Sequence, residues 1–382
     1  MDGSGNALAF DPERQALARR RLRESLVWGF FGITVSMLGV FLTLPTGLSL
    51  RLEAWALSLT THPWGVVAVY VVVGYLVLAV LALPLRVVGR RSELKYGLTR
   101  QSWPSWALDR LKSTVLGLLF ALLAIEVLYW TIRNFGEVWW VVLWILSIGF
   151  SLLAGFLGPV FLLPLFYRVA ELKDPGLRDR LQDLSARAGV RAIGVYEFRS
   201  SAKTERGTAA VAGLGRTRRI LLSDHISREY AGEEVEGILA HELAHHANRD
   251  VARSLLVSAL LSLLLLLVLD RLVRGTMGAY GIASLDQVAN LPLFILFGGL
   301  FYTLTAPLSR ALSRRREALA DRRGAELSGH PTGMARALIK LHDQNLGLAD
   351  PHPWIERLFY SHPSGRRRVR RLLARQRGAG DA

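Results

Sequence analysis

Long apolar runs alternate with short charged segments over most of the chain. Six of these runs approach or exceed the roughly 20 apolar residues that a helix needs to cross a bilayer. They lie at 26–44, 64–85, 114–130, 138–163, 254–269 and 291–308. One such run is also typical of a buried helix in a soluble core, but six together predict a polytopic membrane protein. The third and fifth runs are short and need their flanking residues to span.

Between the fourth and fifth runs, the apolar spacing becomes that of a soluble domain. Residues 174–190 have helical spacing, residues 192–198 favour a strand, and residues 208–224 favour two strands around a glycine-containing turn. A helix then begins near residue 232 and continues with little interruption into the fifth run. Another helical stretch follows the sixth run and ends at Gly329.

The charged residues between the runs predict which side of the membrane each segment faces. The net charge of the 382-residue chain is +16. Arginine and lysine concentrate before the first run and at 86–112, whereas the loops after the first, third and fifth runs hold few of them. The positive-inside rule therefore predicts that both termini and residues 167–252 face the cytoplasm, which agrees with an even number of spans.

This organisation predicts five segments, of which two are membrane-spanning. They are a cytoplasmic tail at 1–24, a four-span domain at 25–166, a cytoplasmic segment at 167–252, a two-span segment at 253–309 and a cytoplasmic segment at 310–382. Because only a pair of spans separates the last two cytoplasmic segments, we expect them to meet at the membrane surface.

Composition argues against several other classes of protein. The chain has no cysteine, so neither a disulfide nor a thiolate metal site is available. The basic residues follow the membrane flanks and are not interleaved with aromatic residues on one surface. We therefore expect the lipid bilayer as a partner and no nucleic acid. No small-residue cleavage site follows the first run, which predicts a retained anchor.

The segment GILAHELAHHANRD at 237–250 holds three of the nine histidines. Residues four apart lie on one face of a helix, so His241 and His245 can direct their imidazoles to one point. Glu242 lies about 100° around the helix, beside that point. This HExxH arrangement is typical of a zinc site whose glutamate is the general base, although an ordinary polar helix can also contain it by chance.

A catalytic zinc ion usually has three protein ligands, so another segment should supply the third. His246 lies about 100° from His245, on the wrong face, and His225 precedes the helix. The segment EALAD offers Glu317 and Asp321, again four apart. Glu317 could be the ligand while Asp321 holds an imidazole N–H. The alternative is an ordinary acidic face paired with neighbouring arginines.

These motifs resemble the M48 family of integral-membrane zinc metallopeptidases, which combine HExxH with a later ExxxD. Further segments are similar to the type I CAAX prenyl protease branch of that family. They are ELKYGLTRQS at 93–102, LPLF at 163–166, ALIKLHDQNLG at 337–347 and FYSHPSGRRRV at 359–369. The resemblance begins near residue 60 and covers most of the chain after it.

The resemblance implies a metal site and a hydrolytic reaction. His241, His245 and Glu317 would bind one zinc ion. Glu242 would be the general base, and Asp321 would support a metal ligand. The expected activity is that of a zinc-dependent metalloendopeptidase acting on a peptide or protein substrate.

The resemblance also implies residues that contact the substrate. His362 would contact the substrate and the developing oxyanion, and Arg368 would help to order that corner. The substrate would lie as an added strand along one edge of the domain. The residues expected at that edge are Thr208, Ala209, Ala210 and Val211.

Three departures separate the chain from the prenyl proteases. Thr208 stands where those enzymes usually carry asparagine, and about six spans are predicted where the eukaryotic members have seven. Asn248 and Asp250, after the motif, are similar to the bacterial heat-shock branch of the same family.

The alternatives are therefore a quality-control metalloprotease with no prenyl requirement and, from another class, a non-catalytic metal-binding transporter or scaffold. The preferred prediction is a membrane metalloendopeptidase that cleaves prenylated or membrane-embedded chains near the cytoplasmic face of a bacterial inner or plasma membrane. We expect a mainly α-helical fold, a bundle of about six spans with a zincin-like cytoplasmic domain containing a small β-sheet.

Overall fold

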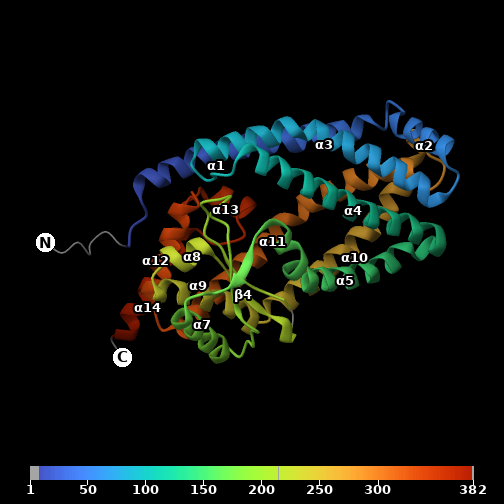
Figure 1. Ribbon diagram of the computed structural model, residues 1–382. Coiled ribbons are helices and arrows are strands. Elements are labelled where there is room, and N and C mark those ends of the chain that lie inside the picture. The colour runs from blue at the N-terminus through green and yellow to red at the C-terminus, as the bar shows by residue number, and fades with distance from the viewer. Residues whose placement is uncertain (1–7, 214, 381–382) are drawn as a thin grey trace.

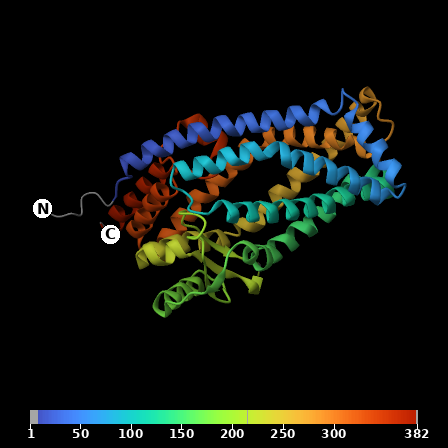
Figure 2. The same cartoon turned by 45° about the horizontal axis from the view of Figure 1, so that its top comes forward.

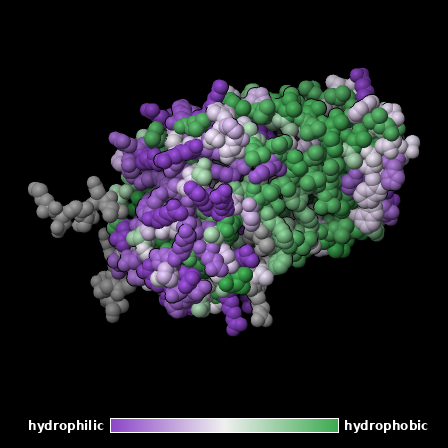
Figure 3. Space-filling model, in the orientation of Figure 1, coloured by the Kyte–Doolittle hydropathy of each residue, from purple (hydrophilic) through white to green (hydrophobic). Residues whose placement is uncertain are grey.

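The computed structural model describes residues 8–213 and 215–380. A bundle of long helices occupies one end of the molecule, and a mixed α/β region occupies the other (Figure 1). Apolar residues cover the bundle, whereas polar residues gather over the α/β region and, more thinly, at the far end of the bundle (Figure 3). The predicted architecture, a membrane bundle with one polar domain, is confirmed.

The bundle contains the predicted apolar runs. Within the described residues, five stretches are long and apolar enough to cross a membrane, and one of them, Trp103–Leu157, turns at Gly136 (φ 51°) and so holds two helices. No more than 28% of any apolar window is buried, so this surface faces outward, as contact with lipid requires. The helices are α1 (Pro12–Leu42), α2 (Leu48–Leu59), α3 (Pro63–Lys95), α4 (Trp103–Phe135), α5 (Trp139–Leu157), α10 (Asp250–Thr276) and α11 (Leu291–Ser328).

Within the N-terminal tail predicted at 1–24, the described residues are helical from Pro12 onwards. Asp11 caps α1 by accepting hydrogen bonds from the next amides, and Pro12 begins the helix, so α1 starts well before the apolar run. The Gln15 side chain donates to Asp343 Oδ1 at 2.8 Å and accepts from the Ala349 amide at 2.9 Å. These contacts attach the first membrane helix to the C-terminal part of the polar domain, beside which its first turns lie (Figure 2). Residues 1–7 of the predicted tail lie outside the described residues.

The polar domain contains a small mixed sheet. Among the described residues its strands are ordered β1-β2-β4-β3, with β2 and β4 parallel and the other two pairs antiparallel. The strands predicted at 192–198 and 208–224 agree with β2, β4 and β3, whereas the three-residue β1 is too short to produce a sequence pattern. The strands are β1 (Val169–Glu171), β2 (Val195–Phe198), β3 (Ala209–Ala212) and β4 (Arg219–Ser223).

Helix α9 (Gly232–Ala247) lies between the sheet and the C-terminal helices. Its Leu239 and Leu243, four residues apart, are fully buried against Ile220 of β4 and residues of α7. A side chain at Gly237 would place its Cβ 2.8 Å from Met334 Cα, so this glycine permits close crossing of α9 and α12. The remaining helices are α6 (Leu163–Phe166), α7 (Pro175–Arg187), α8 (Asp224–Glu229), α12 (Pro331–Gln344), α13 (Pro353–Phe359) and α14 (Gly365–Gly380).

Candidate metal centre

The candidate metal ligands meet where α9 and α11 cross. Gly324 of α11 permits this approach, because a Cβ there would lie 3.0 Å from the backbone of His241. One ligand atom each from His241, His245 and Glu317 lies within 4.8 Å of the others. The crossing therefore brings the HExxH and ExxxD segments to a single point.

In both histidines, the two ring nitrogens have different neighbours. His241 Nδ1 lies 3.0 Å from Asp321 Oδ1, and His245 Nδ1 lies 2.9 Å from Asp250 Oδ2. The two Nε2 atoms lie 3.3 Å apart, at 3.2 and 3.4 Å from the carboxylate of Glu317. A carboxylate that accepts a hydrogen bond from Nδ1–H leaves the Nε2 lone pair free for a metal ion.

The Glu317 carboxylate also fits a cation. Its Oε2 atom is buried and has no partner with hydrogen-bond geometry among the described residues, although it lies 3.2 Å from His241 Nε2. Burial raises the pKa of the Glu317 carboxyl group, but His241, His245 and His362 lower it well below its usual range, so the group is ionised and attracts positive charge. Two imidazoles and one carboxylate form a common set of ligands for catalytic zinc, so the residues fit a divalent ion of that kind.

Asp321 is held by Arg368 of α14. The guanidinium donates to both carboxylate oxygens, with Nε–Oδ2 at 2.8 Å and Nη2–Oδ1 at 2.6 Å, and both side chains are 8% exposed. Such a bidentate pair is strong and directional. Arg368, which we expected to order the substrate corner, fixes the carboxylate that orients the His241 ring and also lines the cavity beside Glu242.

Sequence reasoning did not assign Asp250 to the site. The continuous helical pattern suggested little interruption after His245, but α9 ends at Ala247 and Arg249 adopts a left-handed conformation (φ 56°) before α10 begins. This break turns the buried Asp250 back onto His245. Asn248, a residue type that often ends helices, was the available signal.

Glu242 and His362 lie at the rim of the cluster. Burial raises the pKa of the Glu242 carboxyl group above its usual range. His362 Nε2 lies 3.2 Å from Glu317 Oε1, and its Nδ1 lies 2.8 Å from Ser361 Oγ, while the side chain is 53% exposed. His362 therefore faces both solvent and the candidate metal ligands.

A cavity of about 130 Å³ opens beside Glu242. An apolar cavity of about 150 Å³ is large enough for a benzene ring, so this one can take an aliphatic side chain. Polar lining comes from His241, Glu242, His362 and Arg368, and apolar lining comes from Ile238, Met334, Ala337, Leu338 and Leu341.

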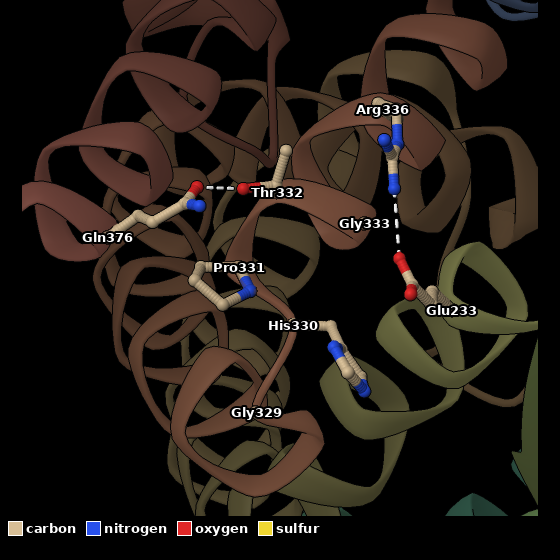
Figure 4. Close-up of a pocket in the computed structure, with 8 residues that line it drawn as sticks. All are labelled: Glu233, Gly329, His330, Pro331, Thr332, Gly333, Arg336 and Gln376. Carbon is tan, nitrogen blue, oxygen red and sulfur yellow. Dashed lines mark hydrogen bonds and ion pairs between the residues drawn. The ribbon is translucent and has the colours of Figure 1, made fainter. Parts of the chain in front are cut away.

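A larger cavity of about 410 Å³ lies elsewhere on the domain, beside the first turn of α9 (Figure 4). Its residue Glu233 is eight positions before His241, or about 12 Å along the helix. Arg336 and Glu233 form an ion pair across it at 2.9 Å. Because none of the residues that line it belongs to the metal cluster, the chemistry is better assigned to the smaller cavity.

The expected substrate edge is an edge of the sheet in this structure. Ala209, Ala210 and Val211 belong to β3, whose only partner among the described strands is β4, and Thr208 precedes it. His246 Nε2 lies 3.0 Å from Val211 O. The helix that carries the candidate metal ligands thus also contacts the edge strand.

Comparisons with known proteins extend over nearly the whole chain. Residues 171–376 match peptidase family M48, and residues 7–168 match the CAAX prenyl protease N-terminal domain, described as five membrane helices. The crystal structure of S. mikatae Ste24p has the same fold, with a TM-score of 0.85 at 20% identity, covering 95% of this chain and 89% of that chain.

Similar sequences come from several branches. The uncharacterized metalloprotease YhfN of Bacillus subtilis is 29% identical over 344 residues, which are 89% of this chain and 81% of that protein. CAAX prenyl protease 1 of Saccharomyces cerevisiae is 26% identical over 71% of this chain, which spans 64% of its length. A protease HtpX homolog of Pelotomaculum thermopropionicum is 32% identical over 54% of this chain and 78% of that protein. The chain is thus a multi-pass membrane metalloprotease and belongs to peptidase family M48.

Proposed function

We propose that this protein is a zinc-dependent endopeptidase whose active site faces the cytoplasm at a bacterial inner or plasma membrane. The observation that carries this proposal is the orientation of the two histidine rings. Each Nδ1 contacts a carboxylate, and both Nε2 atoms point towards Glu317. The excess of arginine and lysine on one side of the apolar runs supports the cytoplasmic orientation.

In this proposal, His241, His245 and Glu317 hold one zinc ion. When bound, zinc lowers the pKa of a coordinated water to about 7 and polarises the scissile carbonyl group. Arg368 and Asp321 keep the His241 ring in the ligating orientation, and Asp250 does the same for His245. The buried Glu317 oxygen without a hydrogen-bond partner supports a cation at this point.

Glu242 is the proposed general base. Burial raises the pKa of its carboxyl group towards the working pH, which favours both uptake and release of a proton. The carboxylate accepts a proton from the attacking water and later donates it to the leaving amine. His362, which is half exposed and beside Glu317, is suited to donate a hydrogen bond to the developing oxyanion.

The substrate would be an extended peptide that adds to the free edge of β3, with one side chain in the cavity beside Glu242. Thr208 can donate only one hydrogen bond from its side chain, in place of the paired donor and acceptor of an asparagine. The candidate metal ligands lie near the start of α10 and in the later part of α11, and both helices also contain apolar stretches long enough to cross a membrane. This position favours prenylated or membrane-embedded chains.

The test compares a farnesylated CAAX peptide with its unprenylated twin, using purified protein and a Glu242→Gln control. We expect cleavage of the prenylated peptide, with activity at least about 100-fold lower in the variant because proton transfer is lost. Metal analysis of both proteins should give one zinc ion per chain.

A quality-control protease is the second candidate, favoured by the HtpX homologs and by Asp250 after the motif. Equal, Glu242-dependent cleavage of both peptides would support it. Equal rates for wild type and Glu242→Gln would contradict both enzymatic proposals and favour a non-catalytic metal-binding membrane protein.

A further inference from the structure

The proposed reaction has no role for His246, which follows the metal ligand candidate His245. Its side chain nevertheless connects two parts of the site. His246 Nε2 lies 3.0 Å from the carbonyl oxygen of Val211, so the helix that carries both histidine ligands is joined to the edge strand β3. The direction of that carbonyl determines whether the contact occupies a group on which a substrate strand could otherwise pair.

The Val211 carbonyl points away from the sheet. The Ser223 amide donates to Thr208 O at 2.8 Å, so Thr208 faces β4. In an antiparallel pair, the backbone N–H and C=O groups of successive residues point alternately towards the partner strand and away from it. Those of Val211, three residues after Thr208, therefore point towards the free edge of β3. Ile220, opposite Val211, agrees with this pattern because its amide donates to Gly194 O at 3.0 Å, on the other side of β4.

The free edge of β3 is consequently short. Ala209 N–H, Ala209 C=O and Val211 N–H have no hydrogen-bond partner among the residues that the structure describes, whereas Val211 C=O already accepts from His246. At Gly213 the chain turns with φ 97°, and a Cβ there would lie 2.7 Å from Thr217 O. An extended peptide thus finds a pairing edge that ends at Val211.

We propose that His246 is a positioning residue for the substrate strand. It fixes the distance between β3 and the metal ligands, and by holding the Val211 carbonyl it ends the edge on which a peptide can pair. This inference rests on the proposed peptidase function and adds the element that sets the substrate's register.

The contribution of this hydrogen bond can be separated from that of the ring by two variants in the full-length, zinc-loaded protein. His246→Phe keeps a flat ring without a donor, whereas His246→Gln keeps an amide donor. We expect the phenylalanine variant to raise KM for the peptide cleaved by wild type about tenfold, with kcat within about twofold, because one net hydrogen bond is lost. The glutamine variant should stay within about threefold of wild type.

Matched controls distinguish a positioning role from a general loss of structure. His330→Phe alters a histidine at the distant cavity of Figure 4 and should leave KM unchanged. Zinc content should be the same in all four proteins. An unchanged KM in His246→Phe, or an equal rise in both His246 variants, would overturn the proposal.

A binding measurement keeps the inference testable when no peptide is cleaved. A fluorescent peptidyl hydroxamate spans the β3 edge, whereas acetohydroxamate reaches only the zinc ion. We expect His246→Phe to weaken the peptidyl probe about tenfold and to leave acetohydroxamate binding unchanged. Equal weakening of both probes would overturn the positioning role. A wild type that binds the peptidyl probe through His246 but cleaves neither CAAX peptide would contradict only the proposed substrate.

Discussion

The two candidate histidine ligands lie four residues apart on one helix, yet their supports differ. His241 is 10% exposed and contacts Asp321, which is itself locked by Arg368 from a third helix. His245 is 21% exposed and contacts Asp250, only five residues further along the chain. One support depends on the packing of α9, α11 and α14, and the other depends on a local break between α9 and α10.

Because the two supports differ, we expect them to contribute differently to metal affinity and to folding stability. Asp321 and Arg368 form a buried ion pair, so removing either partner leaves the other charge without compensation. Asp250 is also buried, but its cationic neighbours depend on it less, since Arg253 is 63% exposed and 3.8 Å away and the protonated His245 ring also contacts Glu317. We therefore expect damage behind His241 to affect both properties, and damage behind His245 to affect mainly the metal.

The largest effect on metal binding is expected for Glu317, which contacts both His241 and His245. Glu317→Ala removes the only proposed carboxylate ligand. Loss of a residue that only hydrogen-bonds to a ligand lowers metal affinity by up to about 100-fold, so the loss of this ligand should lower zinc affinity by more than that. The metal-free variant should unfold at a lower temperature than metal-free wild type, because the carboxylate lies within 3.4 Å of His241, His245 and His362 and helps to keep the His245 ring protonated. Zinc titration and thermal unfolding measure the two effects, and unchanged zinc affinity would exclude Glu317 as a ligand.

Asp321→Ala should produce the largest loss of stability. Arg368 would stay buried without its carboxylate, at a cost of about 3–5 kcal/mol in the free energy of unfolding. Zinc affinity should also fall about 10–100-fold. The double variant Asp321→Ala/Arg368→Met should recover much of the stability and none of the affinity. If the single variant unfolds at the same temperature as metal-free wild type, the Asp321–Arg368 ion pair does not stabilise the protein.

Asp250→Ala should weaken zinc binding about 10–100-fold and lower the free energy of unfolding by less than Asp321→Ala does, because Glu317 still pairs with His245. The matched variant Asp250→Asn keeps an oxygen that accepts the His245 Nδ1–H and should bind zinc more tightly than the alanine variant. Both are compared by zinc titration and thermal unfolding of the metal-free proteins. A stability loss as large as that of Asp321→Ala would remove the distinction between the two supports.

The smallest predicted effect is proton release on metal binding. Burial alone would lower the pKa of His245, but its hydrogen bonds with Glu317 and Asp250 raise it to about 9 in the metal-free protein. At pH 7.5 the ring is therefore protonated, and zinc must displace a proton that is absent above about pH 10. Calorimetry in buffers of different ionisation enthalpy should detect this release, which should be smaller in Asp250→Ala. Equal release at pH 7.5 and pH 10 would contradict the raised pKa.

Several features could be predicted because they depend on residues close in the chain. The apolar runs and the four-residue spacing of His241 and His245 are local patterns, and the spans and the helix agree with them. The spacing of the ExxxD segment offered Glu317 as a third ligand but left an ordinary acidic face as the alternative, and the resemblance to a family favoured the ligand. Glu317 and Asp321 look like an ordinary acidic face until α11 is packed against α9.

Other features required the folded chain. The left-handed Arg249 that returns Asp250 to His245 interrupts a stretch that otherwise has a continuous helical pattern. The contact between His246 and Val211 joins residues 35 positions apart, and a residue on the wrong face for the metal gave no sign of its partner.

The sequence by itself determined the membrane helices, the metal-binding motif and the strands long enough to alternate, since each is encoded by spacing along one element. Only the tertiary structure decided which carboxylate orients which imidazole, where Arg368 lies and how much of β3 stays open. These depend on the crossing of α9 with α11 and on the packing of α9 against the sheet. Contacts between elements are set by packing geometry, which a local pattern does not contain.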